Sequence, residues 1–227
     1  MQRMRFAVFL TLVISGCAST TPKPVDQLGV GEHEKAASAA QREASEHRRL
    51  AEEYVAPPCP SNAPCWSALS NPKAAMEREQ AERQQRYAAE HRARAEKLRE
   101  AEKRYCAGVS EYDRSVSPFF HIHDIRGVEP VTTPTGALSG IVVSFKNIRG
   151  MTLDRIQSIV NCHIARDTAL GHDVPEMADC PLVPRVHAIV FRGDEGIVVR
   201  IMADDDAAAK QLERCSTLIK AAMPPSI

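Results

Sequence analysis

Histidine and cysteine are the residues of this chain whose types and spacing could support chemistry. His121 and His123 are separated by one residue, and an extended backbone would put both rings on one face with Cα atoms about 6.5–7 Å apart. His163 and Asp167 are an i, i+4 pair on a predicted helix, and His172 follows the glycine that ends it. These five residues could bind zinc or copper, with Asp167 as a ligand or as a hydrogen-bond acceptor. We favour the alternative, in which a half-buried His163 pairs locally with Asp167 and both His121 and His123 face solvent, because spacing across loops does not fix geometry.

No recognised catalytic signature accompanies these residues. The sequence has no Gly-x-Ser-x-Gly elbow, no His-Glu-x-x-His motif, no glycine-rich phosphate loop and no dinucleotide fingerprint. Cys162 and His163 are adjacent, and neighbouring helical side chains diverge by about 100°, so they cannot form a direct nucleophile–base hydrogen bond. We therefore predict a non-catalytic protein.

The N-terminus has the pattern of an export signal. Arg3 and Arg5 precede a nearly continuous apolar run from Phe6 to Ile14, and Ser15-Gly16 are small residues immediately before Cys17. The run is too short to be a spanning helix. This arrangement resembles the lipobox of bacterial lipoproteins, whose new N-terminal cysteine is acylated after the leader is cut away. An ordinary cleaved signal peptide is the alternative.

The resemblance is confined to the leader, and it implies a location rather than an activity. It implies that residues 1–16 are a signal peptide and that a lipid on Cys17 anchors the protein to the membrane of the cell envelope. Ala18, which stands where an aspartate usually retains the protein at the inner membrane, implies the outer membrane, facing the periplasm. Residues 17–31 then form a tether between the lipid and the first folded element.

The remaining cysteines fit an oxidising compartment. Of seven in total, one is Cys17, and six are left to form disulfides: Cys59, Cys65, Cys106, Cys162, Cys180 and Cys215. Cys59 and Cys65 bracket a turn-rich loop, so we expect them to pair. The other four allow three pairings, and Cys162, which projects opposite the buried stripe of its helix, is better placed to bridge to Cys180 than to join His163. Metal ligation by thiolates is disfavoured, because no Cys-x-x-Cys occurs.

The charge balance indicates no nucleic-acid or anionic-lipid footprint. The chain has 29 basic and 29 acidic residues, and removing Arg3 and Arg5 with the leader leaves 27 against 29. The predicted partners are therefore the membrane, through the lipid anchor, and other proteins, with no nucleic acid among them.

Residues 32–107 are dominated by strong helix formers and predict a helical hairpin or coiled coil. The first helix should run from about Glu32 to Val55, since Pro57-Pro58 forbid its continuation. The second should begin at Asn71 as N-cap and end near Gly108. Residues 41–48 match residues 85–92 at an offset of 44, which indicates two copies of one helix.

Each predicted helix has a stripe of mainly alanine at alternating four- and three-residue spacing. The stripes are His33, Ala37, Ala40, Ala44, His47, Ala51 and Tyr54, and Ala81, Gln84, Ala88, His91, Ala95, Leu98, Glu102 and Tyr105. With the turn near residue 63, His33 comes within about one turn of His91. That pair could hold a metal, although we favour rings that cover the alanine surface with their nitrogens toward solvent or a glutamate. An alanine stripe buries little area, so the hairpin should need loop closure, docking or self-association.

Residues 108–227 predict a small α+β sandwich. Apolar patterning gives strands over 124–131, 140–147, 186–192 and 197–202, a helix from Thr152 to Gly171, and a last helix from Asp204 to the prolines at 224–225. The order is strand, strand, helix, strand, strand, helix, which predicts helices on one face of a mainly antiparallel sheet.

Together these features predict an envelope lipoprotein, anchored in the outer membrane, with a structural or protein-binding role. The helical hairpin would bind an envelope protein or a second copy of the chain. Periplasmic zinc or copper sequestration or sensing is the alternative, and a hydrolytic enzyme is the least favoured.

Overall fold

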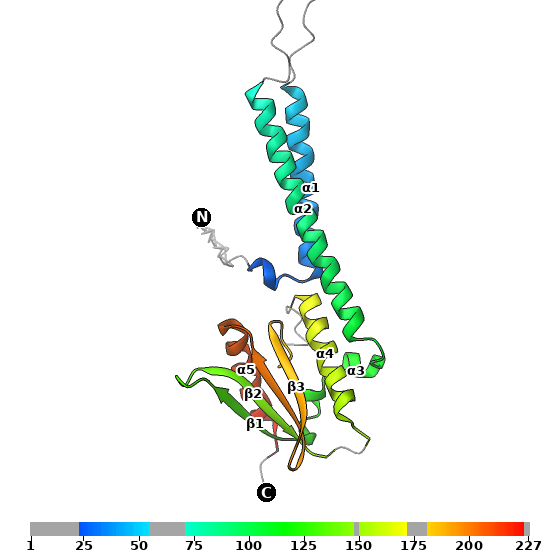
Figure 1. Cartoon of the computed structure of the whole chain (residues 1–227), viewed down its shortest axis with the longest axis vertical. Coiled ribbons are helices and arrows are strands. Elements are labelled where there is room, and N and C mark those ends of the chain that lie inside the picture. Colours follow the sequence, from blue (N-terminus) through cyan, green and yellow to red (C-terminus); the bar gives the residue numbers. More distant parts are fainter. Residues whose placement is uncertain (1–22, 55–70, 148–149, 172–180, 225–227) are drawn as a thin grey trace, which may run out of the picture.

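The chain folds as an α+β protein in which a long helical hairpin stands on a four-stranded sheet with two helices (Figure 1). The computed structural model describes residues 23–54, 71–147, 150–171 and 181–224. Its principal elements are α1 (Val30–Glu53), α2 (Pro72–Tyr105), α3 (Glu111–Ser115), β1 (Ile125–Thr132), β2 (Leu138–Phe145), α4 (Leu153–Leu170), β3 (Val186–Gly193), β4 (Gly196–Ala203) and α5 (Asp206–Ala222). Short 3-10 turns are η1 (Val25–Gln27), η3 (Pro118–Phe120) and η4 (Ile122–Asp124). The predicted fold class and the order of strands and helices are confirmed.

The hairpin helices begin where local capping chemistry allows. At the start of α2 the Asn71 side chain accepts a 3.0 Å hydrogen bond from the backbone nitrogen of Lys73, and Pro72 occupies the first turn, as predicted. At the start of α1 the backbone nitrogen of Gly29 donates a 2.9 Å hydrogen bond to the Glu32 carboxylate. The first helix therefore starts slightly earlier than the sequence pattern predicts.

Alanine forms most of the contact between α1 and α2. The buried residues of the two helices are His33, Ala37, Ala40, Ala44 and Ala51, and Ala74, Ala81, Ala88, His91 and Ala95. The predicted stripes are correct except at their ends, where Tyr54 and Tyr105 are exposed. Tyr54 lies beyond the last turn of α1, and Tyr105 lies beyond the part of α2 that α1 covers. We call this contact the alanine seam.

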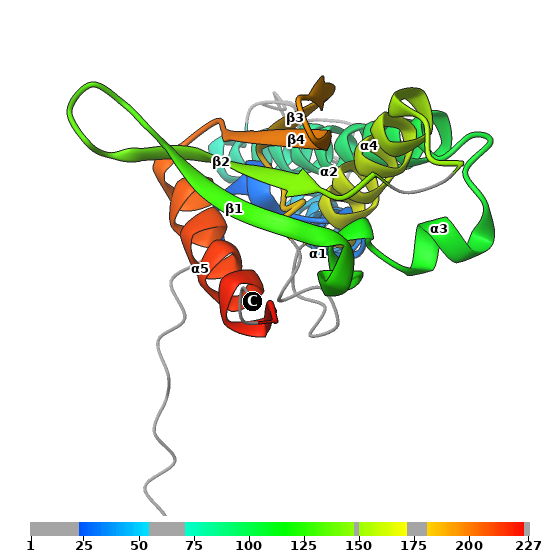
Figure 2. The same cartoon turned by 90° about the horizontal axis from the view of Figure 1, so that it is seen from below.

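The sheet is antiparallel throughout, with strand order β1-β2-β4-β3 (Figure 2). Alternate side chains of the two central strands face one core: Ile141, Val143 and Phe145 of β2, and Ile197, Val199 and Ile201 of β4. α5 covers this face over β1 and β2 with Leu212 and Ile219, and α4 covers it beside β3 with Ile156 and Val160. Burying each of these large side chains contributes about 1.5–3 kcal/mol, so this core is the main source of stability.

A glutamine of α4 satisfies the outer edge of β3. The Gln157 amide nitrogen donates to the Ala188 carbonyl at 3.0 Å, and the Val190 backbone nitrogen donates to the Gln157 amide oxygen at 2.8 Å. The side chain amide thus takes the place of a peptide group of a further strand. At this point the edge is a poor template for pairing with another chain.

The hairpin is covalently joined to the α+β domain by a disulfide between Cys106 and Cys162. Cys106 is the C-cap of α2, and Cys162 lies on the face of α4 opposite the sheet, where α2 packs. The sequence favoured Cys180 as the partner of Cys162, and this expectation is wrong, because the hairpin docks on that face of α4. Cys215 is buried on α5 and is not the partner of Cys106. Cys59, Cys65 and Cys180 lie outside the described residues.

A second contact joins the start of α1 to the end of α4. Gly171 ends α4 in the left-handed conformation, with φ of 81°, and packs directly on Gly29. A Cβ atom on Gly29 would lie 2.5 Å from the Gly171 backbone nitrogen, so no larger residue fits there. The Lys23 amine also donates to the Gly171 carbonyl at 3.1 Å. The hairpin is therefore fixed to α4 at the base of both helices.

Removing the disulfide should destabilise the folded protein. The bridge closes a loop with a sequence separation of 56 residues, and constraining such a loop in the unfolded chain is worth about 4 kcal/mol in the chain-entropy description. We expect the double variant Cys106→Ala, Cys162→Ala to lower the free energy of unfolding in urea by about 2–5 kcal/mol. An unchanged denaturation midpoint would contradict a structural role for this bridge.

Candidate functional site

The histidines that the less favoured metal hypothesis would join are not brought together in the described part of the chain. His121 and His123 are exposed; His121, at φ −80° and ψ 60°, is the residue between η3 and η4, and His123 lies within η4. The extended backbone on which their shared face depended is therefore absent, and this expectation is corrected. His163 and Asp167 are both buried on α4, and His172 lies outside the described residues. The described residues contain no group of three or more histidine, cysteine, aspartate or glutamate side chains that could hold a metal.

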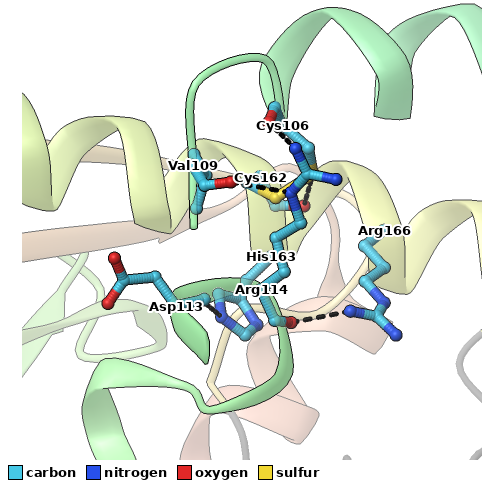
Figure 3. Close-up of a disulfide and its surroundings, with 7 residues drawn as sticks. All are labelled: Cys106, Val109, Asp113, Arg114, Cys162, His163 and Arg166. Atoms are coloured by element: carbon cyan, nitrogen blue, oxygen red, sulfur yellow. Dashed lines mark hydrogen bonds between the residues drawn. A yellow bond between two sulfur atoms is a disulfide. The ribbon is translucent and has the colours of Figure 1, made fainter. Parts of the chain in front are cut away.

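His163 instead fixes the segment that joins the hairpin to the sheet (Figure 3). Its Nε2 atom lies 2.8 Å from the Asp113 carbonyl oxygen, to which it donates. The expected half-buried histidine paired with Asp167 is therefore a fully buried one that contacts the backbone of α3. Burial lowers the pKa of His163, while hydrogen bonds to the Asp113 and Val116 backbone act in the opposite direction.

Two arginines complete this junction. Arg114 donates from Nε to the Val109 carbonyl at 2.9 Å and from Nη2 to the Cys106 carbonyl at 2.8 Å, next to the disulfide (Figure 3). Arg166 of α4 donates to the Arg114 carbonyl at 2.8 Å. The Cys106 carbonyl at the end of α2 and the Val109 carbonyl in the turn after it thus accept from a charged donor, and this turn is held on α4. Sequence reasoning missed Arg114 and Arg166, because no local pattern marks them.

A second polar arrangement lies inside the alanine seam. The Nδ1 atoms of His33 and His91 are 2.7 Å apart, and His47 Nδ1 lies 2.6 Å from a Glu77 carboxylate oxygen. The proximity of His33 and His91 was predicted from the hairpin register, and the structure confirms it. The 44-residue repeat relates His33 to Glu77 and His47 to His91, so the two pairs occupy equivalent places. We call them the histidine rung and the carboxylate rung.

The histidine rung is enclosed. His33 is 3% exposed and His91 is 2% exposed, and the edge of the Tyr87 ring packs on His91 with ring centroids 4.4 Å apart. One Nδ1 carries a hydrogen and donates it to the other, while His91 Nε2 is buried with no hydrogen-bond partner. Adding a proton to the pair would therefore require a buried N–H at His91 Nε2 without an acceptor, which is costly.

Burial is the main cause that lowers the pKa of both rung histidines. Repulsion from Arg94 lowers both further, and His91 lowers that of His33. The Glu32 carboxylate acts in the opposite direction on His33, and the Glu90 carboxylate does so on His91. Both rings are therefore neutral near pH 7 in the folded protein.

The sheet face away from α4 and α5 is open and partly apolar. Val142, Val198 and Met202 are half-buried there, and Ile189 of β3 is 57% exposed. Arg200 lies over the Phe191 ring, 5.4 Å from its centroid, on the same face. This surface and the charged outer faces of the hairpin are the broad contact surfaces that the described residues offer.

Fold and site together define an α+β protein with a helical arm fixed to its globular part. No family model matches the chain, and neither a curated protein nor a solved structure does. Among the described helices, none has the length and apolar character needed to cross a membrane.

Acid should loosen the hairpin through the histidine rung. Because the pKa of both histidines is lowered from 6.5, the unfolded chain binds more protons, and the free energy of unfolding should fall as the pH drops below about 6.5. We expect thermal unfolding followed by circular dichroism to show this fall in stability between pH 7.5 and pH 5. The variant His33→Leu, His91→Leu should show a smaller fall over the same range.

His163 should account for much of the remaining acid sensitivity, because its pKa is lowered as well. The exposed His123→Ala variant is the matched control and should behave as the wild type. If the double leucine variant kept the full pH dependence, the rung would not be the source.

Proposed function

We propose that this chain is a lipid-anchored protein of the bacterial cell envelope with a structural or protein-binding role, in which the helical hairpin is a rigid binding arm. The observation that supports this most directly is the fixed junction. A disulfide, a glycine–glycine contact and charged hydrogen bonds hold both helices on α4. An arm fixed in this way presents its surface without the ordering cost of a flexible one.

The chemistry of the junction agrees with an oxidising compartment. Disulfides persist in secreted and periplasmic proteins and are rare in the cytosol. The Cys106–Cys162 bridge joins buried cysteines in one hydrophobic cluster with Val109 and Ile159, as expected of a structural bond. This supports export, which the lipobox resemblance implies.

The proposed anchor would place the junction near the membrane. Lys23, which is docked on Gly171, follows Cys17 by six residues, and six extended residues span at most about 20 Å. From this docking point the 24 residues of α1 span about 36 Å. The hairpin is therefore long enough to hold a partner well away from the anchoring point. Ion pairs on its outer faces, such as Arg83 with Glu79, are exposed and contribute little to stability, so they can exchange for contacts to a partner.

The anchor is tested by Cys17→Ala. Without the thiol there is no site for the acyl chains, so we expect the protein to move from the membrane fraction to the soluble fraction of the envelope. Ser19→Ala, which leaves the cysteine in place, should remain in the membrane fraction. Normal membrane fractionation of Cys17→Ala would refute the proposed anchor.

The binding role is tested by photo-cross-linking in intact cells. A photoreactive amino acid at the exposed position of Arg86 on α2 should give a discrete adduct with an envelope protein or a second copy, identified by mass spectrometry. The same amino acid at the exposed position of Glu213 on α5, away from the hairpin and from the open sheet face, should give none. A chain that stays monomeric and cross-links to no envelope protein from the arm would overturn the proposal.

A further inference from the structure

The histidine rung places two ring nitrogens face to face inside an apolar seam. Ala37, one turn after His33, and Ala88, one turn before His91, belong to one buried cluster with Ala40. The two Nδ1 atoms lie 2.7 Å apart, and His91 Nε2 is a buried polar atom that no described residue satisfies. The histidine rung is thus an imidazole pair in which one ring nitrogen lacks a hydrogen-bond partner, whereas the equivalent carboxylate rung is a histidine–carboxylate pair.

We propose that the histidine rung is a two-coordinate site for a soft monovalent cation of the copper(I) class, bound in a line between the Nδ1 atoms of His33 and His91. This inference is independent of the lipid anchor and of the protein-binding role. Closed-shell monovalent copper and silver form stable linear complexes with two nitrogen donors, and imidazole is among the ligands that suit copper.

The donor set explains why the site favours this class of ion. Zinc in a structural site takes four ligands, and the described residues provide no cluster of three or more ligand side chains. A divalent ion would also cost more to desolvate in an alanine seam than a monovalent one. Burial, the largest effect at both rings, and Arg94 oppose a positive charge at the pair, while the Glu32 carboxylate near His33 and the Glu90 carboxylate near His91 favour it.

Binding needs a small movement and no net loss of protons. At about 2 Å for each metal–nitrogen bond, the Nδ1 atoms would stand about 4 Å apart, roughly 1.3 Å more than their 2.7 Å separation. Rotation of the two rings can supply most of this change. The hydrogen shared between the Nδ1 atoms moves to Nε2 of the ring that donated it, so each ring binds the cation as a neutral ligand. This state places a hydrogen on the buried His91 Nε2, the same cost that opposes protonation of the pair, and the two metal–nitrogen bonds must offset it.

The repeat supplies the test variants. His33→Glu converts the histidine rung into a copy of the carboxylate rung, so it keeps a polar contact across the seam but removes one soft donor. His91→Gln removes the other donor. His47→Gln changes the carboxylate rung and leaves both proposed ligands in place. Circular dichroism of each variant verifies that its helices are intact.

The experiment titrates the purified protein with silver nitrate in chloride-free buffer, with the Cys106–Cys162 disulfide kept intact. Silver(I) is the redox-inert probe, followed by calorimetry and by the ¹⁵N shifts of the histidine rings. We expect wild type and His47→Gln to bind one silver ion with shifts at the Nδ1 atoms of His33 and His91. His33→Glu and His91→Gln should bind it at least tenfold more weakly.

A competition titration of copper(I) against bicinchoninate, without oxygen, should rank the variants in the same order. Equal silver affinity in His33→Glu and wild type would overturn the proposal, as would unshifted ring nitrogens. Zinc binding at this pair as tight as that of silver would overturn the two-coordinate assignment.

Discussion

The packing of alanine against alanine in the hairpin is the constraint on which the rest of the structure depends. Small side chains let α1 and α2 approach closely, but each buried alanine removes little apolar area from water, so the seam alone gives marginal stability. The hairpin therefore needs attachments, and it has them at its base: the disulfide from Cys106, the contact between Gly29 and Gly171, and the arginine contacts to the end of α2. A well-packed leucine seam would not require such attachments.

Helix α4 is where these attachments meet. One face buries Ile156 and Val160 against the sheet, the opposite face presents Cys162 to α2, and its C-terminal Gly171 receives α1. A fourth position, Gln157, closes the edge of β3. Because α4 packs into the apolar core of the sheet, this well-packed core directly supports the hairpin, whose alanine seam is only marginally stable. The orientation of the arm is consequently a property of the core and not of a linker.

Local sequence patterns predicted what local chemistry determines. Alternating and helical periodicity gave the four strands and the principal helices, and the predicted turn near residue 63 gave the register that places His33 near His91. Contacts between elements distant in sequence could not be predicted. Cys162 pairs with Cys106 because of where the hairpin docks on α4, which no local pattern reveals. No local pattern marks Gln157 as the residue that bonds the edge of β3 either. The hypothesis that His121 and His123 share one face was wrong, because the chain turns there instead of extending.

The polar rungs give the seam what alanine cannot supply, which is a unique register. Alanine recurs along both helices at nearly heptad spacing, so sliding one helix by seven residues would again bring alanine against alanine. The same slip would place Gln84 or Leu98, instead of His91, opposite His33. The buried imidazole pair would then be lost, and its desolvated nitrogens would lack their partner at a cost of about 1–3 kcal/mol each. Buried polar pairs are often retained for this kind of specificity rather than for net stability. The rungs can therefore hold the register of the arm and still leave His33 and His91 available for a second role.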